Sequence, residues 1–102
     1  MSDASPLHPV ILREFTTAFG PPHRTLGKDM HWGLRPTPTL AAINILVNGS
    51  SDHPVLWLFD PHHHDPLNPN DGVLNEVVRT EADITRLVAM ITQRVAAAGG
   101  AR

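Results

Sequence analysis

The chain has 102 residues, of which 41% are hydrophobic and 18% are charged. This length supports one domain without room for a second hydrophobic core, and the composition excludes a globally disordered protein. The formal net charge is −2, and the 8 lysines and arginines form no run, so nucleic acid is excluded as the main ligand. Cysteine is absent, which excludes disulfides, thiolate nucleophiles and zinc–thiolate sites.

The amino-terminal residues show no pattern for export. Residues 1–6 lack a basic region followed by an apolar core, and the longest apolar runs in the chain are far shorter than a membrane span. We therefore expect a soluble, cytoplasmic protein without a membrane partner. We expect a single α+β domain over residues 1–102, with frayed ends at 1–6 and 99–102.

A first amphipathic helix is predicted over residues 8–19. The apolar side chains that recur at helical spacing are Leu7, Ile11, Phe15, Ala18 and Phe19. Gly20 and the two prolines after it end the helix, because glycine suits the left-handed cap and proline cannot continue a helix. Residues 22–28 are predicted to be a polar connection.

Three segments with the patterns of strands follow. In residues 30–35 the large apolar residues Met30, Trp32 and Leu34 alternate with His31, Gly33 and Arg35, so the apolar side chains share one face. Residues 41–48 are rich in β-branched side chains, and a turn that begins at Asn48-Gly49 ends them. Residues 55–60 begin with an apolar run on both faces, which is typical of a central strand buried from two sides.

Residues 73–79 are predicted to be a fourth strand, although the same residues could form the front of the last helix. The strand is favoured because Thr80, with Asp83 three residues later, approximates a capping box at which a helix begins. A helix is then predicted over 81–98, and Gly99-Gly100 is expected to stop it. Its apolar stripe consists of Ile84, Leu87, Val88, Ile91, Val95 and Ala98.

These elements predict a four-stranded antiparallel meander with two helices, in the order α-β-β-β-β-α. Short connections favour pairing between strands that follow each other in the chain. Two amphipathic helices bury their stripes most simply when both pack on one face of the sheet.

The other face of this sheet is expected to expose apolar side chains. One assignment places Trp32, Ile43, Ile45, Trp57 and Phe59 under the helices, so that Leu46, Leu56 and Leu58 face outward. The reversed assignment exposes a larger patch that carries both tryptophans. Because large apolar patches on monomers usually mark interaction surfaces, we expect an interface at Leu46, Leu56 and Leu58. Its partner is a second copy of the chain, which gives a homodimer, or another protein.

A histidine-rich segment carries the densest polar chemistry, with three consecutive histidines between Asp60 and Asp65. In extended backbone His62 and His64 point the same way and could chelate nickel, copper or zinc. Asp60, Asp65 or His53 could complete such a site. The alternative interpretation is a solvent-exposed, proline-bounded loop that binds nothing.

A second polar group surrounds the first predicted strand. Arg24, Lys28 and His31 could form an anion pocket, in which the Arg24 guanidinium binds a phosphate or carboxylate. No glycine-rich cradle accompanies them, so an ordinary charged connection explains the same residues.

No recognised catalytic motif occurs in the chain. The sequence favours a small non-enzymatic interaction or accessory module that self-associates or binds a partner protein through its sheet, without a cofactor. The alternative function is a metal-binding protein or small metal-dependent enzyme that uses the His62/His64 loop and a divalent transition metal.

Overall fold

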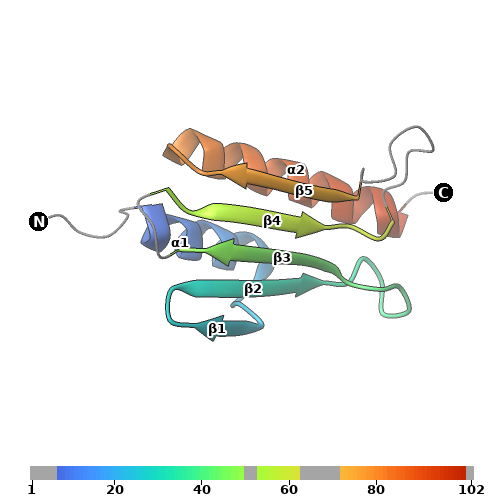
Figure 1. Cartoon of the computed structure of the whole chain (residues 1–102). Coiled ribbons are helices and arrows are strands. Elements are labelled where there is room, and N and C mark those ends of the chain that lie inside the picture. Colours follow the sequence, from blue (N-terminus) through green and yellow to red (C-terminus); the bar gives the residue numbers. More distant parts are fainter. Residues whose placement is uncertain (1–6, 50–52, 63–71, 101–102) are drawn as a thin grey trace, which may run out of the picture.

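The architecture is a two-layer α+β arrangement in a computed structural model that describes residues 7–49, 53–62 and 72–100. Its elements are α1 (Leu7–Phe19), β1 (Arg24–Leu26), β2 (Asp29–Leu34), β3 (Ile43–Asn48), β4 (Val55–Phe59), β5 (Val73–Val77) and α2 (Glu81–Gly100). All strand pairs are antiparallel, in the order β1-β2-β3-β4-β5, and both helices lie on one side of the sheet (Figure 1). The predicted α+β class is confirmed, and the segment that could have been helical is strand β5.

The predicted number of four strands is wrong, because the sheet has five. The additional strand, β1, lies in the segment that was predicted to be a polar connection, and it pairs with β2. A two-residue turn joins them, and Gly27 takes the positive φ of 62° that such a turn needs at its first position. All three residues of β1 are exposed, so no hydrophobic alternation marks this strand in the sequence.

The core lies between the helices and the sheet. From the strands it contains Met30, Trp32, Ile43, Ile45, Val47, Leu56 and Leu58, and from the helices Leu7, Ile11, Phe15, Ile84, Leu87 and Ile91. Trp32 fixes the end of α1, because its ring lies 5.1 Å from that of Phe15 and its indole N–H donates to the Gly20 carbonyl at 2.9 Å. A buried indole is thus satisfied by the carbonyl that closes the helix.

The expected orientation of Leu56 and Leu58 is wrong. Both side chains are 0% exposed under the helices, so they cannot belong to an outward interface. The pairing of β4 with β3 explains this, because Leu56 stands opposite Val47 and Leu58 opposite Ile45. Of the three leucines expected at the interface, only Leu46 lies on the side of the sheet that no helix covers, with 42% of its surface exposed.

The beginning of α2 is held by the predicted capping box. The Thr80 hydroxyl accepts the N–H of Asp83 at 3.2 Å. In return, the Asp83 carboxylate accepts the N–H groups of Arg79 at 2.9 Å and Thr80 at 3.1 Å. These hydrogen bonds, the one from Arg79 above all, lower the pKa of Asp83 because they favour its charged form.

The end of α2 differs from the prediction. The helix is described to Gly100, two residues beyond the predicted end at residue 98, so it includes both glycines. Gly99 lies against Pro36 in the β2–β3 connection, where a Cβ on Gly99 would stand 2.6 Å from the Pro36 carbonyl oxygen. The glycine at position 99 therefore permits close packing against this connection.

We expect the capping carboxylate to make the protein sensitive to acid. A lowered pKa means that Asp83 contributes stability above its unfolded pKa of about 3.9, and that this contribution is lost as pH falls through the folded pKa. Urea unfolding of wild type and Asp83→Asn should therefore show a difference in stability at pH 6 that shrinks at pH 3. The control Glu81→Gln removes a charge from the same helical turn without touching the cap. A difference between wild type and Asp83→Asn that stays constant with pH would contradict this role.

Candidate functional site

The side of the sheet without helices, which we call the open face, is the first candidate site. Residues that stand opposite each other on paired strands point to the same side of a sheet. The central row of the open face consists of Arg24, His31, Leu46, Trp57 and Asn75. The rows beside it hold Leu26, Asp29, Asn48, Val55 and Val77 at one end, and Gly33, Asn44, Phe59 and Val73 at the other.

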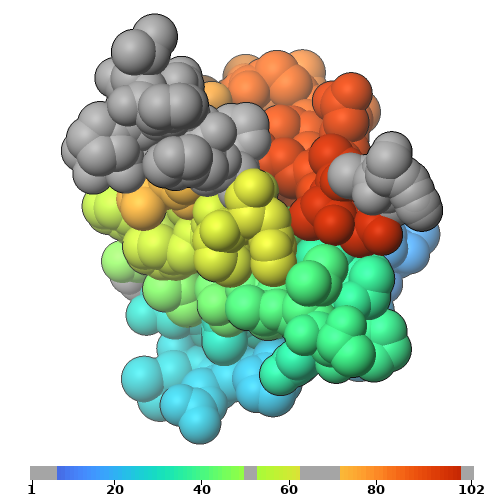
Figure 2. Space-filling model, turned by 90° about the vertical axis from the view of Figure 1, so that its right-hand side faces the viewer, coloured from blue at the N-terminus to red at the C-terminus, as the bar shows by residue number. Residues whose placement is uncertain are grey.

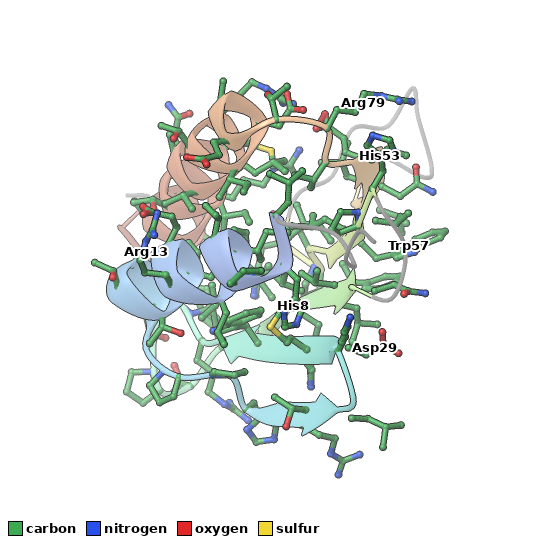
Figure 3. The ribbon with its side chains drawn as sticks, turned by 90° about the vertical axis from the view of Figure 1, so that its left-hand side faces the viewer. His8, Arg13, Asp29, His53, Trp57 and Arg79 are labelled. Atoms are coloured by element: carbon green, nitrogen blue, oxygen red, sulfur yellow. The ribbon has the colours of Figure 1, made fainter. Side chains whose placement is uncertain are left out.

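Apolar side chains gather on the half of the open face that β3, β4 and β5 form. We call Leu46, Val55, Trp57, Phe59, Val73 and Val77 the apolar patch. Trp57 is 39% exposed and Val73 is 46% exposed, and Figure 3 shows Trp57 directed away from the helices. The rings of Trp57 and Phe59 are nearly parallel, with centroids 6.3 Å apart and planes 6° apart. The patch is therefore a flat apolar surface with a stacked aromatic pair in it.

The half of the open face that β1 and β2 form carries charged and polar side chains together with one exposed leucine, Leu26. Arg24 stands opposite His31, and Asp29 follows the turn that contains Lys28. The Nε2 atom of His31 lies 2.9 Å from the Asn44 side-chain oxygen. Arg24 and Lys28 are exposed, so these side chains line an open surface. The anion pocket of Arg24, Lys28 and His31 stays a prediction.

The end of β4 carries a buried carboxylate, which is the second candidate site. Asp60 is 4% exposed, and its Oδ1 accepts the backbone N–H of His62 at 2.9 Å while its Oδ2 lies 3.4 Å from Nη1 of Arg94. His62 in turn donates from Nε2 to the Ala41 carbonyl at 2.7 Å. Figure 2 shows the yellow end of β4 between the green β2–β3 connection and the red end of α2. We call Asp60, His62 and Arg94 the Asp60 cluster. Its contacts connect the end of β4, the β2–β3 connection and the end of α2.

Two cavities flank this carboxylate. One, of about 460 Å³, lies between Asp60, His62 and the last turns of α2, where Arg94 also lines it. The other, of about 520 Å³, lies on the opposite side of Asp60 beside Ala41, Phe59 and Val73. Both are wide open to the surface. Asp60 therefore separates two hollows at this end of the sheet.

The predicted metal ligands are only partly placed. Asp60 and His62 lie close together, but the interactions above already engage both oxygens of the carboxylate and Nε2 of the imidazole. His53 precedes β4 whereas Asp60 follows it, so an extended chain on the order of 20 Å separates them. His64 and Asp65 lie outside the described residues. Within the described ranges, no three His, Cys, Asp or Glu side chains form a group that could hold a metal ion.

Comparisons with protein-family models, with curated proteins and with solved structures gave no match to this chain. Among the residues that the structure describes, neither helix has the length and apolar character needed to cross a bilayer. The open face and the Asp60 cluster are therefore interpreted from their own chemistry.

Proposed function

We propose that this protein is a small non-enzymatic interaction module that self-associates through the open face of its sheet. The observation that supports the proposal is the apolar patch, in which Trp57 and Phe59 stack on a flat surface. Large exposed patches of this kind usually mark interaction surfaces, and aromatic side chains are enriched at the centres of interfaces. Covering the patch would recover burial energy that the single chain leaves unused.

A second copy of the chain is the partner that this surface fits. The six residues of the patch carry no charge, and the polar side chains that border it on β3 and β5 include the neutral amides Asn44 and Asn75. Such a surface needs no partner of opposite charge. It is complementary to another flat apolar surface, and a two-fold axis places the same patch on both subunits. Two sheets that pack in this way lie about 10 Å apart with interdigitated side chains.

The metal-dependent alternative has less support from the geometry. Asp60 is paired with Arg94, and this guanidinium would compete with a metal ion for the carboxylate. The His62/His64 loop therefore remains a prediction without a described set of ligands.

Substitution of one leucine tests the proposed function. Leu46→Glu places a charge in the apolar patch, and we expect it to weaken association across the face about 100-fold or more, because an unpaired charge would be buried. Leu12 on α1 is a matched control, since 36% of its surface is exposed against 42% for Leu46. Sedimentation equilibrium should show a lower mass for Leu46→Glu, whereas Leu12→Glu keeps the wild-type mass.

Circular dichroism of both variants should show that they are folded. A Leu46→Glu protein that is folded and has the wild-type mass at every concentration would contradict association through the open face.

A further inference from the structure

The outer edge of β5 presents unpaired backbone groups. The Asp60 N–H donates to the Gly72 carbonyl at 2.7 Å, and the Val78 N–H donates to the Pro54 carbonyl at 2.7 Å. Both bonds connect the β5 side of the hairpin to the β4 side. The backbone N–H and C=O groups of successive residues point to opposite sides of a strand. Leu74 and Glu76, like Gly72 and Val78, therefore direct their groups toward β4.

The three remaining residues of β5 direct their N–H and C=O groups away from the sheet. They are Val73, Asn75 and Val77. β5 is the last strand of the sheet, and among the described residues no backbone hydrogen bond satisfies these groups from outside the sheet. Such a row of donors and acceptors is a template for another strand.

This edge lacks the very short strand, the lysine and the proline that often prevent pairing. The opposite edge, β1, has only 3 residues, whereas β5 has 5 and contains neither proline nor lysine. The one charge on β5, Glu76, lies on the helix side and is neutralised by Arg86, whose two terminal nitrogens lie 2.8 and 3.2 Å from its carboxylate oxygens. Glu76 therefore brings no unpaired charge to an incoming strand.

We propose that β5 pairs antiparallel with β5 of a second copy, with Asn75 on the two-fold axis. The order of residues in β5, Val-Leu-Asn-Glu-Val, is symmetric at its ends, so Val73 then faces Val77 of the partner subunit on both sides of the axis. Each of these facing pairs is of the hydrogen-bonded kind, in which two residues exchange both bonds. This register satisfies every outward backbone group of Val73, Asn75 and Val77.

The side chains of the open face fit the same register. Val73 and Val77 are 46% and 40% exposed, and facing valines bury each other's surface in a sheet. The two Asn75 amides meet at the axis, where each offers a donor and an acceptor to the other.

The position of the apolar patch supports pairing at this edge and not at β1. Five of its six residues lie on β4 and β5, while Arg24, Asp29 and His31 lie on β1 and β2. In one chain the patch is therefore displaced to one side. Joining two chains at β5 brings both patches together, with the charged residues at the periphery, which is the usual arrangement of an interface.

This edge contact goes beyond the proposed function, because it does not need the face contact. If both form, the two kinds of two-fold axis give an assembly of four chains, in which two continuous sheets pack face to face. If only one forms, the assembly contains two chains. The two contacts can therefore be tested separately on the full chain.

Two variants of Asn75 test the edge. Asn75→Pro removes an outward N–H and leaves the β4–β5 ladder intact, because proline is tolerated in an edge strand where its nitrogen faces outward. Asn75→Ala is the control, since it keeps the N–H. By sedimentation equilibrium we expect four chains for wild type and Asn75→Ala, two for Asn75→Pro, two for Leu46→Glu, and one for the combination of Asn75→Pro with Leu46→Glu.

Hydrogen exchange measured by NMR supplies a second readout that needs no proline. In Leu46→Glu, whose only expected contact is the edge, the amide protons of Val73, Asn75 and Val77 should be protected at high concentration and lose protection on dilution. Rapid exchange of these amides in the associated protein, or a folded Asn75→Pro with the wild-type mass, would overturn edge pairing and leave the face contact standing. Conversely, two chains in wild type, two in Leu46→Glu and one in Asn75→Pro would support the edge and refute the face.

Discussion

Replacing Leu87 with alanine is expected to lower the free energy of unfolding by about 2 to 5 kcal/mol. Leu87 is 0% exposed, and it lies on α2 between two further buried residues, Ile84 and Ile91. The substitution removes apolar contacts and leaves a cavity that the sheet and helices can only partly fill. Because domains of this size are stable by about 5–15 kcal/mol, the expected loss is a large part of the total.

The matched control for this prediction is another leucine. Leu26 on β1 is 79% exposed, so Leu26→Ala should change stability by no more than about 0.5 kcal/mol. Urea denaturation followed by circular dichroism measures both. Equal effects at the two positions would show that the apolar stripe of α2 does not form the core.

Replacing Asp60 with alanine is expected to cost about 3 kcal/mol, because it leaves Arg94 without its partner in a partly buried position. The side chains of Asp60 and Arg94 are 2% and 20% exposed, so solvent can replace only part of what the arginine loses. The substitution also removes the acceptor of the His62 N–H. Asp60→Asn keeps an oxygen for that N–H, so it should cost less than Asp60→Ala.

A double-mutant cycle with Arg94→Ala measures how much of this effect comes from the ion pair. We expect the cost of Asp60→Ala to be smaller in the Arg94→Ala background, since no guanidinium is then left unpaired. Asp29→Ala, at an exposed aspartate on β2, is the control and should change stability by no more than about 0.5 kcal/mol. If the losses of unfolding free energy from Asp60→Ala and Arg94→Ala simply add, the two side chains are not coupled, and this result would contradict a stabilising ion pair.

The helices and four of the strands could be predicted from their apolar residues. These residues recur at the spacing of a helix or a strand that buries one of its sides. The capping box at Thr80 and Asp83 was likewise visible as a local pattern, and the structure forms it. β1 gave no such pattern, because an exposed edge strand buries nothing. The face to which Leu56 and Trp57 point was equally undetermined, since β4 is apolar at every position and only its pairing with β3 decides the face.

The candidate sites were predictable to a smaller extent. The histidine-rich run marks the correct end of β4, but the partner of Asp60 is Arg94, which lies 34 residues away in the chain. Asp60 before proline does carry one local signal, because aspartate often accepts a hydrogen bond from the backbone two residues later. The unpaired edge of β5 follows only from the order of the strands, which a list of elements does not contain.

The two ends of α2 differ in which substitutions they should accept. At Thr80 the helix needs a side chain that accepts a hydrogen bond, so serine, asparagine or aspartate can replace threonine. At Gly99 the helix needs the absence of a side chain, because even a methyl group would meet the Pro36 carbonyl. Homologues of this chain should therefore vary among several polar residues at the first position and retain glycine at the second. A larger residue at position 99 should appear only together with a change in the β2–β3 connection.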